Sequence, residues 1–220
     1  MTLNPIVFGA TGMVGEGVLH VALQSDEVAS VLVVGRKPCG VQHPKLREIV
    51  HPDLFDLSAI EGLLGGVDSC FFCLGVSSVG MKEDAYRRIT YDLTMHCAET
   101  LARCNPAMTF CYVSGTGTDS SEQGRSMWAR VKGKTENDLG ALPFKAVYNF
   151  RPGFIKPMRG MQRTQWFASA LAWSFPLWKA ALPKYVCTLE DLGRAMLRVS
   201  TEGYPTRILE NPDIATAAHG

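Results

Sequence analysis

The sequence predicts an α/β protein built on one doubly wound parallel sheet, in a single domain over residues 1–220. Three observations predict this fold. Short apolar runs alternate with amphipathic segments through the first two thirds of the chain, the links between them are short, and glycines gather directly after the first apolar run. Strands and helices that alternate in this way form parallel sheets with right-handed crossovers.

The expected strands are apolar runs rich in β-branched residues. The run at residues 31–34 contains no polar residue, as is typical of a strand buried on both faces of a sheet. Residues 206–210 fit a further strand at the edge. The main strands are expected at residues 3–8, 31–34, 46–50, 67–74, 109–113 and 145–150.

The expected helices have apolar residues at every third or fourth position. One follows the glycine-rich turn, one covers residues 126–139, and one runs from Thr188 to about Ser200. A short helix is expected at 58–64, between the N-cap Ser58 and the stop at Gly65-Gly66. The longest covers residues 83–104, and its apolar stripe consists of Ala85, Ile89, Leu93, Cys97 and Leu101.

The turn after the first strand reads Gly9-Ala10-Thr11-Gly12-Met13-Val14-Gly15. Its glycines suit a tight turn, a close approach of backbone to a pyrophosphate, and close packing of helix on strand. The helix that follows presents N–H groups and a partial positive charge to phosphates. We therefore expect a Rossmann-type dinucleotide site formed by Gly9, Thr11, Gly12, Met13, Val14 and Gly15.

Two cations, Arg36 and Lys37, follow the second strand. NAD-specific domains place a carboxylate there to bind the ribose 2′-hydroxyl. A guanidinium instead suits a phosphate on that ribose, which it binds through two hydrogen bonds. The pair predicts NADP(H) as the cofactor, with NAD(H) the weaker alternative.

Two further pairs of residues follow strands at the same sheet edge. Asp53 and Leu54 either bracket an adenine, with the carboxylate accepting from the exocyclic amine, or belong to an ordinary turn. Leu74 and Gly75 end the fourth strand, where a small residue lets the backbone approach a ribose.

Composition narrows the class of protein. The net charge of +1 gives no electrostatic support for nucleic-acid binding. No histidine or cysteine spacing indicates a metal site, and the cysteines are interpreted as reduced core residues. Without an expected signal peptide or membrane span, a cytoplasmic location is predicted. The seven cysteines are Cys39, Cys70, Cys73, Cys97, Cys104, Cys111 and Cys187.

Several motifs together resemble the atypical and extended branches of the short-chain dehydrogenase/reductase superfamily. They are the Gly9–Gly15 turn with Thr11 inside it, Phe72-Cys73-Leu74-Gly75, Val131-Lys132-Gly133 and Phe150-Arg151-Pro152-Gly153. Within these branches the chain is most similar to the Tat-interacting-protein oxidoreductase-like group and to bacterial proteins called nucleoside-sugar epimerases.

The resemblance implies roles for single residues. Ser114 would polarise a reacting carbonyl, and Lys132 would hold the nicotinamide ribose and lower the pKa of a catalytic tyrosine. Asp53 and Leu54 would contact adenine. Pro152, Gly153 and Phe154 would border the nicotinamide carboxamide.

The catalytic tyrosine itself is missing, because its position is occupied by Trp128. An indole N–H donates a hydrogen bond but releases no proton near neutral pH. General acid–base transfer contributes about 10²- to 10⁴-fold to a rate. Trp128 therefore either stacks against substrate or nicotinamide, or packs in the core, and Tyr86, Tyr112 and Tyr148 are candidate substitutes for the acid.

Residues 155–185 are expected to form a lid or substrate-side insertion. The Trp- and Phe-rich stretch 161–181 within it has three readings: a cover over an apolar substrate, a peripheral membrane contact, or a subunit interface. The apolar stripe of the helix at 83–104 would also allow a homodimer.

Two functions fit these observations. The first is an NADP(H)-dependent oxidoreductase or epimerase-like enzyme that acts on a small carbonyl or sugar-like substrate. The second is a non-catalytic, NADP(H)-binding redox-sensing regulator, which the missing tyrosine and the mobile-looking residues 115–125 favour.

Overall fold

A computed structural model describes residues 2–158, 160–161 and 185–220. Within these residues seven strands form one parallel sheet, in the order β3-β2-β1-β4-β5-β6-β9. The expected strands are confirmed, although the fourth is shorter than 67–74. Their bounds are β1 (Pro5–Phe8), β2 (Val31–Gly35), β3 (Leu46–Val50), β4 (Ser69–Phe72), β5 (Thr109–Val113), β6 (Ala146–Arg151) and β9 (Ile208–Glu210).

The strand order reverses at β1, which pairs in parallel with β2 on one side and with β4 on the other. This reversal makes the sheet doubly wound, as predicted. In such sheets the crevice at the carboxyl ends of the strands, beside the reversal, is where ligands bind. Here that crevice begins at the glycine-rich turn after β1.

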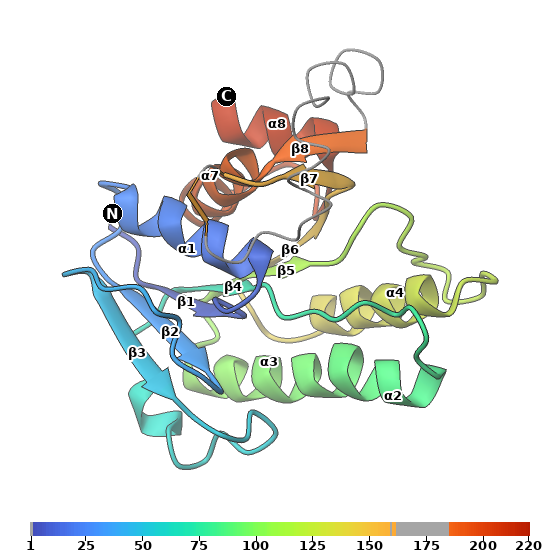
Figure 1. The fold of residues 1–220 in the computed structure, drawn as a ribbon, viewed down its shortest axis with the longest axis horizontal. Coiled ribbons are helices and arrows are strands. Elements are labelled where there is room, and N and C mark those ends of the chain that lie inside the picture. Colours follow the sequence, from blue (N-terminus) through green and yellow to red (C-terminus); the bar gives the residue numbers. More distant parts are fainter. Residues whose placement is uncertain (1, 159, 162–184) are drawn as a thin grey trace.

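Helices cover both faces of the sheet (Figure 1). On one face lie α1 (Met13–Gln24), α7 (Leu189–Thr201) and α8 (Asn211–His219), and on the other lie α2 (Glu83–Arg87), α3 (Leu93–Cys104) and α4 (Met127–Gly140). The start of α7 is confirmed, because Thr188 and Asp191 form a capping box there. Sequence reasoning did not foresee α8.

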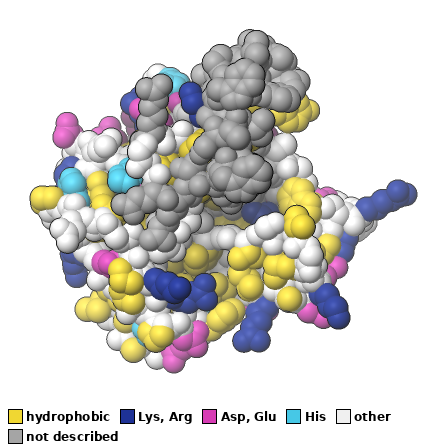
Figure 2. Space-filling model, viewed as in Figure 1, with side chains coloured by type: hydrophobic (Ala, Val, Ile, Leu, Met, Phe, Trp, Pro, Cys, Tyr) yellow, Lys and Arg dark blue, Asp and Glu magenta, His cyan; other side chains and the backbone are white. Residues whose placement is uncertain are grey.

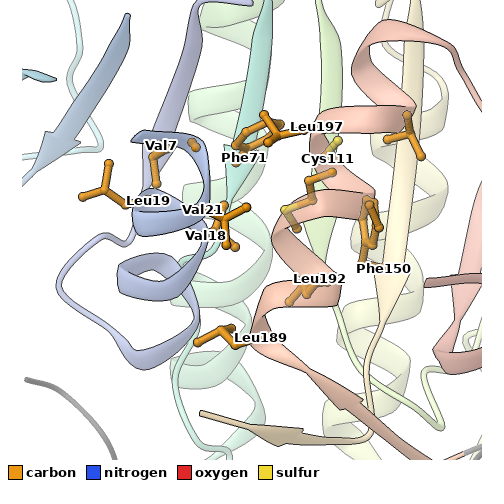
Figure 3. Packing of buried hydrophobic residues seen from close by; sticks show 14 of the residues in the cluster. Val7, Val18, Leu19, Val21, Phe71, Cys111, Phe150, Leu189, Leu192 and Leu197 are labelled. Carbon is orange, nitrogen blue, oxygen red and sulfur yellow. The ribbon is translucent and has the colours of Figure 1, made fainter. Parts of the chain in front are cut away.

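Buried apolar side chains form a core on each side of the sheet. Figure 3 shows the core between the sheet, α1 and α7, where Val18 and Val21 of α1 lie near Leu189 and Leu192 of α7. The two helices pack closely because α1 carries Gly17, where a Cβ would lie 2.0 Å from a methyl carbon of Leu189.

Two expectations about helices are wrong. Residues 58–64 form only turns and a single 3₁₀ turn, η1 (Glu61–Leu63), because Gly65-Gly66 follow too soon for a helix to propagate. The apolar stripe also predicts the wrong buried face for the first part of the segment 83–104. Ala85 and Ile89 are exposed, whereas Tyr86 and Thr90 are buried. A π-helical turn, η2 (Arg88–Asp92), lies there, and its wider turn shifts the buried face by a residue.

The expected lid at 155–185 falls largely outside the described residues, as does almost all of the aromatic stretch 161–181. At its margins β7 (Phe154–Lys156) pairs in parallel with β8 (Val186–Thr188) as a small second sheet. No helix in the described part of the chain is long and apolar enough to cross a membrane. All seven cysteines are free thiols, buried or partly buried.

Candidate functional site

The turn between β1 and α1 leaves no room for side chains at two of its glycines. Gly9 has φ +85°, and a Cβ on it would lie 2.7 Å from the carbonyl carbon of Cys73 on the neighbouring strand end. A Cβ on Gly15 would lie 2.1 Å from the carbonyl oxygen of Gly9. The amide of Gly12 donates to that same oxygen at 2.9 Å and closes the turn.

The outer side of this turn is open. A Cβ on Gly12 would meet only the Gly9 oxygen, at 3.4 Å. Helix α1 begins directly after Gly12, which provides no side-chain cap. The first amides of α1 have no acceptor within the helix and carry its positive dipole end. The backbone of Gly12–Gly15 is therefore fitted to an anionic group such as a pyrophosphate.

Two adjoining cavities, of about 390 and 470 Å³, extend from this turn across the ends of β2 and β4. They share Gly9, Thr11, Arg36, Leu54 and Leu74 in their walls. The first also contains Gly12, Asp53 and Gly75, and the second Gly35 and Lys37. The structure thus brings together residues that sequence reasoning assigned separately to pyrophosphate, adenine and ribose.

Basic side chains lie at one end of these cavities. Arg36 and Lys37 are exposed directly after β2, and neither pairs with a carboxylate among the described residues. Figure 2 shows Lys and Arg side chains gathered over the end of β2 in this view. The loop that carries them is held by the edge strand, because the amide of Cys39 donates to the Glu48 carboxylate at 2.6 Å.

The sequence left open whether Asp53 is an ordinary turn residue or a residue of the adenine site, and its position in the structure is compatible with both. Its Oδ1 accepts from the amide of Phe55 at 2.9 Å, which makes it a turn residue. It also lines the cavity of about 390 Å³ together with Arg36, so its place in the turn does not remove it from the cavity. Leu54 is 3% exposed and forms part of the wall.

Ser114, Lys132 and Trp128 form a second group at the end of β5 and on α4. The Ser114 hydroxyl donates to the Glu136 carboxylate at 2.5 Å and lies 3.1 Å from the Phe150 carbonyl oxygen. Lys132 Nζ donates to the Ser114 carbonyl oxygen at 2.5 Å. Trp128 is partly buried, and its ring would lie 3.5 Å from a Cβ on Gly117. None of the three lines the two described cavities.

Lys132 is a partly buried side chain whose pKa is lower than the ordinary value for lysine. Burial lowers the pKa of Lys132 to about 8, while the negative charge of Glu136 acts in the opposite direction. Lys132 therefore retains most of its positive charge at neutral pH and loses it in the mildly alkaline range.

The three tyrosines that sequence reasoning named as candidate acids lie in the interior. Tyr86, Tyr112 and Tyr148 are each at most 2% exposed. Burial raises the pKa of Tyr86 and, much more strongly, that of Tyr112. In the part of the chain that the structure describes, Tyr185 is the tyrosine with the most exposed side chain, at 55%. It lies beside Pro152-Gly153, because a Cβ on Gly153 would be 2.3 Å from its carbonyl oxygen.

Pro152, Gly153 and Phe154 lie next to the loop that follows Ser114. The amide of Thr116 donates to the Pro152 carbonyl at 3.0 Å, and the Gly153 amide donates to the side chain of Asn211 at 3.1 Å. Asn211, at the start of α8, is 1% exposed and was not foreseen as part of this region.

The loop at 115–125 is held by hydrogen bonds within itself and to α4. The Asp119 carboxylate accepts from the amides of Ser121 and Gly124, at 3.0 and 2.6 Å. Arg130 of α4 donates to the Gly124 carbonyl at 2.7 Å. Gly133 of α4 lets the loop approach, since a Cβ there would lie 1.8 Å from the Asp119 carbonyl oxygen. These contacts give no support to a mobile switch in this loop.

Glu136 and Arg151 are the main residues that sequence reasoning missed. Glu136 is 3% exposed and forms a salt bridge with Arg151 at 2.5 Å. Glu136 follows Lys132 by four positions on α4, so a helical projection would have placed both on one face. Nothing in the sequence indicates that Arg151, at the end of another strand, meets them.

Comparison with known proteins supports one family. Residues 6–126, more than half of the chain, match the model of the NAD dependent epimerase/dehydratase family. The chain is 28% identical over 172 residues to "Protein FMP52, mitochondrial" of Debaryomyces hansenii, covering 77% of this chain and 73% of that protein. It is 29% identical over 167 residues to the protein of the same name from Aspergillus clavatus, covering 73% and 70%.

Solved structures share the fold. Bordetella bronchiseptica WbmF, solved in complex with NAD⁺, has a TM-score of 0.67 at 16% identity, covering 98% of this chain and 77% of that chain. Glucuronic acid dehydrogenase from Chromohalobacter salexigens has a TM-score of 0.67 at 18% identity, covering 95% and 76%. The narrower resemblance to the Tat-interacting-protein group stays a prediction.

The expected cytoplasmic location is wrong by the same comparison. Curated relatives from Debaryomyces hansenii, Aspergillus clavatus and Meyerozyma guilliermondii are all named as mitochondrial proteins. The expectation rested on the reduced cysteines and on the lack of an expected signal peptide or membrane span, and neither observation identifies the compartment in which a domain resides.

Proposed function

Because the chain belongs to the NAD dependent epimerase/dehydratase family, we propose that it is an NADP(H)-binding oxidoreductase or epimerase-like enzyme acting on a small carbonyl or sugar-like substrate. The observation that carries the proposal is the cradle at Gly9, Gly12 and Gly15. The chain excludes side chains from the inner wall of this turn and leaves its outer side open toward the two cavities. A dinucleotide fits this cradle, with its pyrophosphate on the first amides of α1.

The preference for NADP(H) rests on charge. Arg36 lines both cavities, Lys37 lines one of them, and neither is neutralised by a carboxylate among the described residues. A phosphate on the adenosine ribose would bind to Arg36 through two charged hydrogen bonds, with Lys37 as a second positive charge. The family description and the WbmF complex refer to NAD, so this preference is the finer part of the proposal.

The bound cofactor would supply hydride transfer at its nicotinamide ring. The chain would supply Lys132, whose ammonium group would hold the nicotinamide ribose, and Pro152–Phe154 along the carboxamide. Trp128 would contribute an apolar face and an N–H donor. Proton transfer would have to come from elsewhere, and Tyr185, which is exposed and whose backbone lies beside Gly153, is the candidate that we propose.

A non-catalytic NADP(H)-binding regulator is the second candidate. The geometry of Ser114 favours it, because a hydroxyl has one proton and the proton of Ser114 is donated to the carboxylate of Glu136. A carboxylate is a stronger acceptor than a carbonyl, so polarising a substrate would cost a charge-assisted hydrogen bond. The buried tyrosines point in the same direction.

Equilibrium titration with NADPH and NADH tests the cofactor assignment. We expect the full chain to bind NADPH more tightly, and Arg36→Ala to weaken NADPH selectively. Arg47→Ala is the matched control, since Arg47 is exposed on the edge strand β3 and lines neither cavity. Equal affinity for both cofactors, or tighter NADH binding, would refute the preference for NADP(H).

A turnover screen separates the enzyme from the regulator. Aldehydes, ketones, alcohols and nucleotide sugars are incubated with the chain and NADP(H), and nicotinamide absorbance and product formation are followed. Sustained turnover above the buffer rate would reject the regulator. Tight NADPH binding without turnover of any class would reject the enzyme.

A further inference from the structure

A buried carboxylate connects the end of the sheet to α4. Glu136 and Arg151 are 3% and 9% exposed. The Glu136 carboxylate accepts from Nη2 of Arg151 at 2.5 Å on one oxygen and from Nε at 3.0 Å on the other. The oxygen facing Nε also accepts from the hydroxyl of Ser114 at 2.5 Å. Glu136 therefore satisfies donors from both β5 and β6.

Arg151 extends the connection further. Its Nη2 donates to the hydroxyl of Ser120 at 2.6 Å, in the loop after β5. Its Nη1 lies 3.6 Å from the carboxylate of Glu210, at the end of β9. The pair thus fixes the carboxyl ends of three strands relative to one another and to the helix that carries Lys132.

Stability alone does not explain such a pair. Removing two charges from water can cost as much as their attraction returns, so a buried ion pair is weak evidence for a purely stabilising role. A charge at this place, however, acts on its neighbours through a medium of low dielectric constant. Lys132 lies one helical turn before Glu136, and its Nζ already contacts the backbone of Ser114.

The groups facing Lys132 come from several elements. Tyr112 of β5 lies with its ring centre 6.0 Å from Nζ, and Tyr86 of α2 lies behind it. On the sheet side, Arg151 of β6 pairs with Glu136, and Glu210 of β9 lies 3.6 Å from Arg151, so these two charges face Glu136. Both tyrosines stay neutral because burial raises their pKa. Glu136 is the anion whose charge opposes the effect of burial on Lys132.

We propose that Glu136 is a positioning residue of this site: it orients Ser114 and Arg151 at the end of the sheet and places a negative charge one helical turn from Lys132, whose Nζ donates to the Ser114 carbonyl oxygen. The consequence for cofactor binding rests on the proposed function, in which the ammonium of Lys132 holds a ribose. The effect on Lys132 itself does not depend on any ligand.

The direct test is the titration of Lys132, followed by NMR in the chain labelled with [ε-¹³C]lysine and assigned with Lys132→Met. We expect a midpoint near 8 in the native chain. In Glu136→Gln the midpoint should fall by about one pH unit, because a nearby charge is lost. Asp138→Asn is the matched control: it removes a carboxylate from the same helix that contacts Tyr91 and Lys134 instead. Equal midpoints in Glu136→Gln and the native chain would overturn the proposal.

The Gln variant leaves Arg151 buried without its charged partner, which destabilises the fold, so a second variant is needed. The double variant Glu136→Leu/Arg151→Met removes both charges and keeps an apolar pair. This double variant should unfold cooperatively on heating, as a folded protein does. Its Lys132 should still titrate at a lower pH than Lys132 of the native chain. A native midpoint in this folded double variant would show that Glu136 has only a structural role and would overturn the proposal.

NADPH affinity provides the second readout. In Glu136→Gln, or in the double variant, affinity should be several-fold weaker than native at pH 8 and close to native at pH 6, where Lys132 is charged in every variant. The same loss at both pH values would overturn the link to Lys132. Failure of the native chain to bind NADPH would refute the proposed function, while the lysine titration would still decide the role of Glu136.

Discussion

The carbonyl oxygen of Gly9 lies so close to the α-carbon of Gly15 that a methyl group on Gly15 would come within 2.1 Å of it. Gly12 faces that same oxygen, but from a distance at which a Cβ is tolerated, 3.4 Å. The two glycines therefore serve different ends. Gly15 permits the packing of α1 on β1, and Gly12 keeps the outer surface of the turn clear for a ligand.

Alanine substitutions should separate these roles. Gly15→Ala would push the start of α1 away from the Gly9 carbonyl oxygen. It should lower the free energy of unfolding by about 1–3 kcal/mol or more, as overpacking does. Gly12→Ala should melt within a few degrees of the native chain but bind NADPH at least about tenfold more weakly, because its Cβ occupies the ligand side of the turn. Thermal melting and NADPH titration check both variants. A Gly12→Ala chain with native affinity would contradict the placement of the pyrophosphate.

Inverting the charge at position 36 should change the cofactor preference. In Arg36→Asp the carboxylate repels a 2′-phosphate and accepts a hydrogen bond from a free 2′-hydroxyl. NADPH affinity should fall by about 10- to 100-fold, the equivalent of a lost charge-assisted hydrogen bond, while NADH affinity is kept or improved. Lys45→Ala, on the loop before β3, is the control. Parallel losses for both cofactors would mean that Arg36 supports the fold of the loop rather than selecting the phosphate.

Introducing a tyrosine at position 128 tests whether turnover is limited by the lack of a proton donor at that position. In Trp128→Tyr the phenol would stand one helical turn from Lys132, and turnover should rise by about 10²-fold or more if the remaining geometry is competent. Tyr185→Phe in the native background should reduce any existing turnover if Tyr185 provides the proton. Rates are measured as NADPH oxidation under saturating cofactor. No gain in Trp128→Tyr, with cofactor binding intact, would favour the regulator.

The lowered pKa of Lys132 should appear in the pH dependence of stability. Its folded pKa is about 8, whereas the ordinary value is 10.5, so between these values the unfolded chain binds more protons than the folded chain. Stability from this group therefore rises with pH across that window and is lowest below pH 8. Relative to Lys132→Met, the native chain should gain up to about 1.4 kcal/mol per pH unit there. Urea unfolding at pH 7.5 and 9.5 measures the difference, and a constant gap would contradict the assigned pKa.

The sequence was enough to group the residues that line the two cavities, because these residues follow strand ends. Each set begins within three residues of a strand end, and parallel strands bring their carboxyl ends to one edge. The sets are Gly9–Gly15 after β1, Arg36 after β2, Asp53 after β3 and Leu74-Gly75 after β4. Knowing the strands was therefore enough to group these residues. The surroundings of Ser114 were less predictable, because the direction in which its hydroxyl points depends on Glu136 and Arg151, which lie 22 and 37 positions further along the chain.

Two departures from the expected fold have local causes that periodicity does not contain. The π-helical turn at Arg88–Asp92 changes the helical phase. A stripe drawn at constant spacing therefore predicts that Ile89 is buried, whereas in the structure Ile89 is exposed and Thr90 is buried. The strands β7 and β8 are three residues each, too short to give a pattern, and they form because they pair with each other.

By itself the sequence determined the alternation of strands and helices, the glycine turn and the cations after β2. Each of these follows from properties that a residue keeps wherever it stands: apolar surface that must be buried, a missing Cβ, a fixed charge. Only the tertiary structure decided which hydroxyls and tyrosines face inward, and that a buried carboxylate acts on Lys132. Those outcomes depend on the close approach of segments far apart in the chain, where burial and a neighbouring charge change what a side chain does.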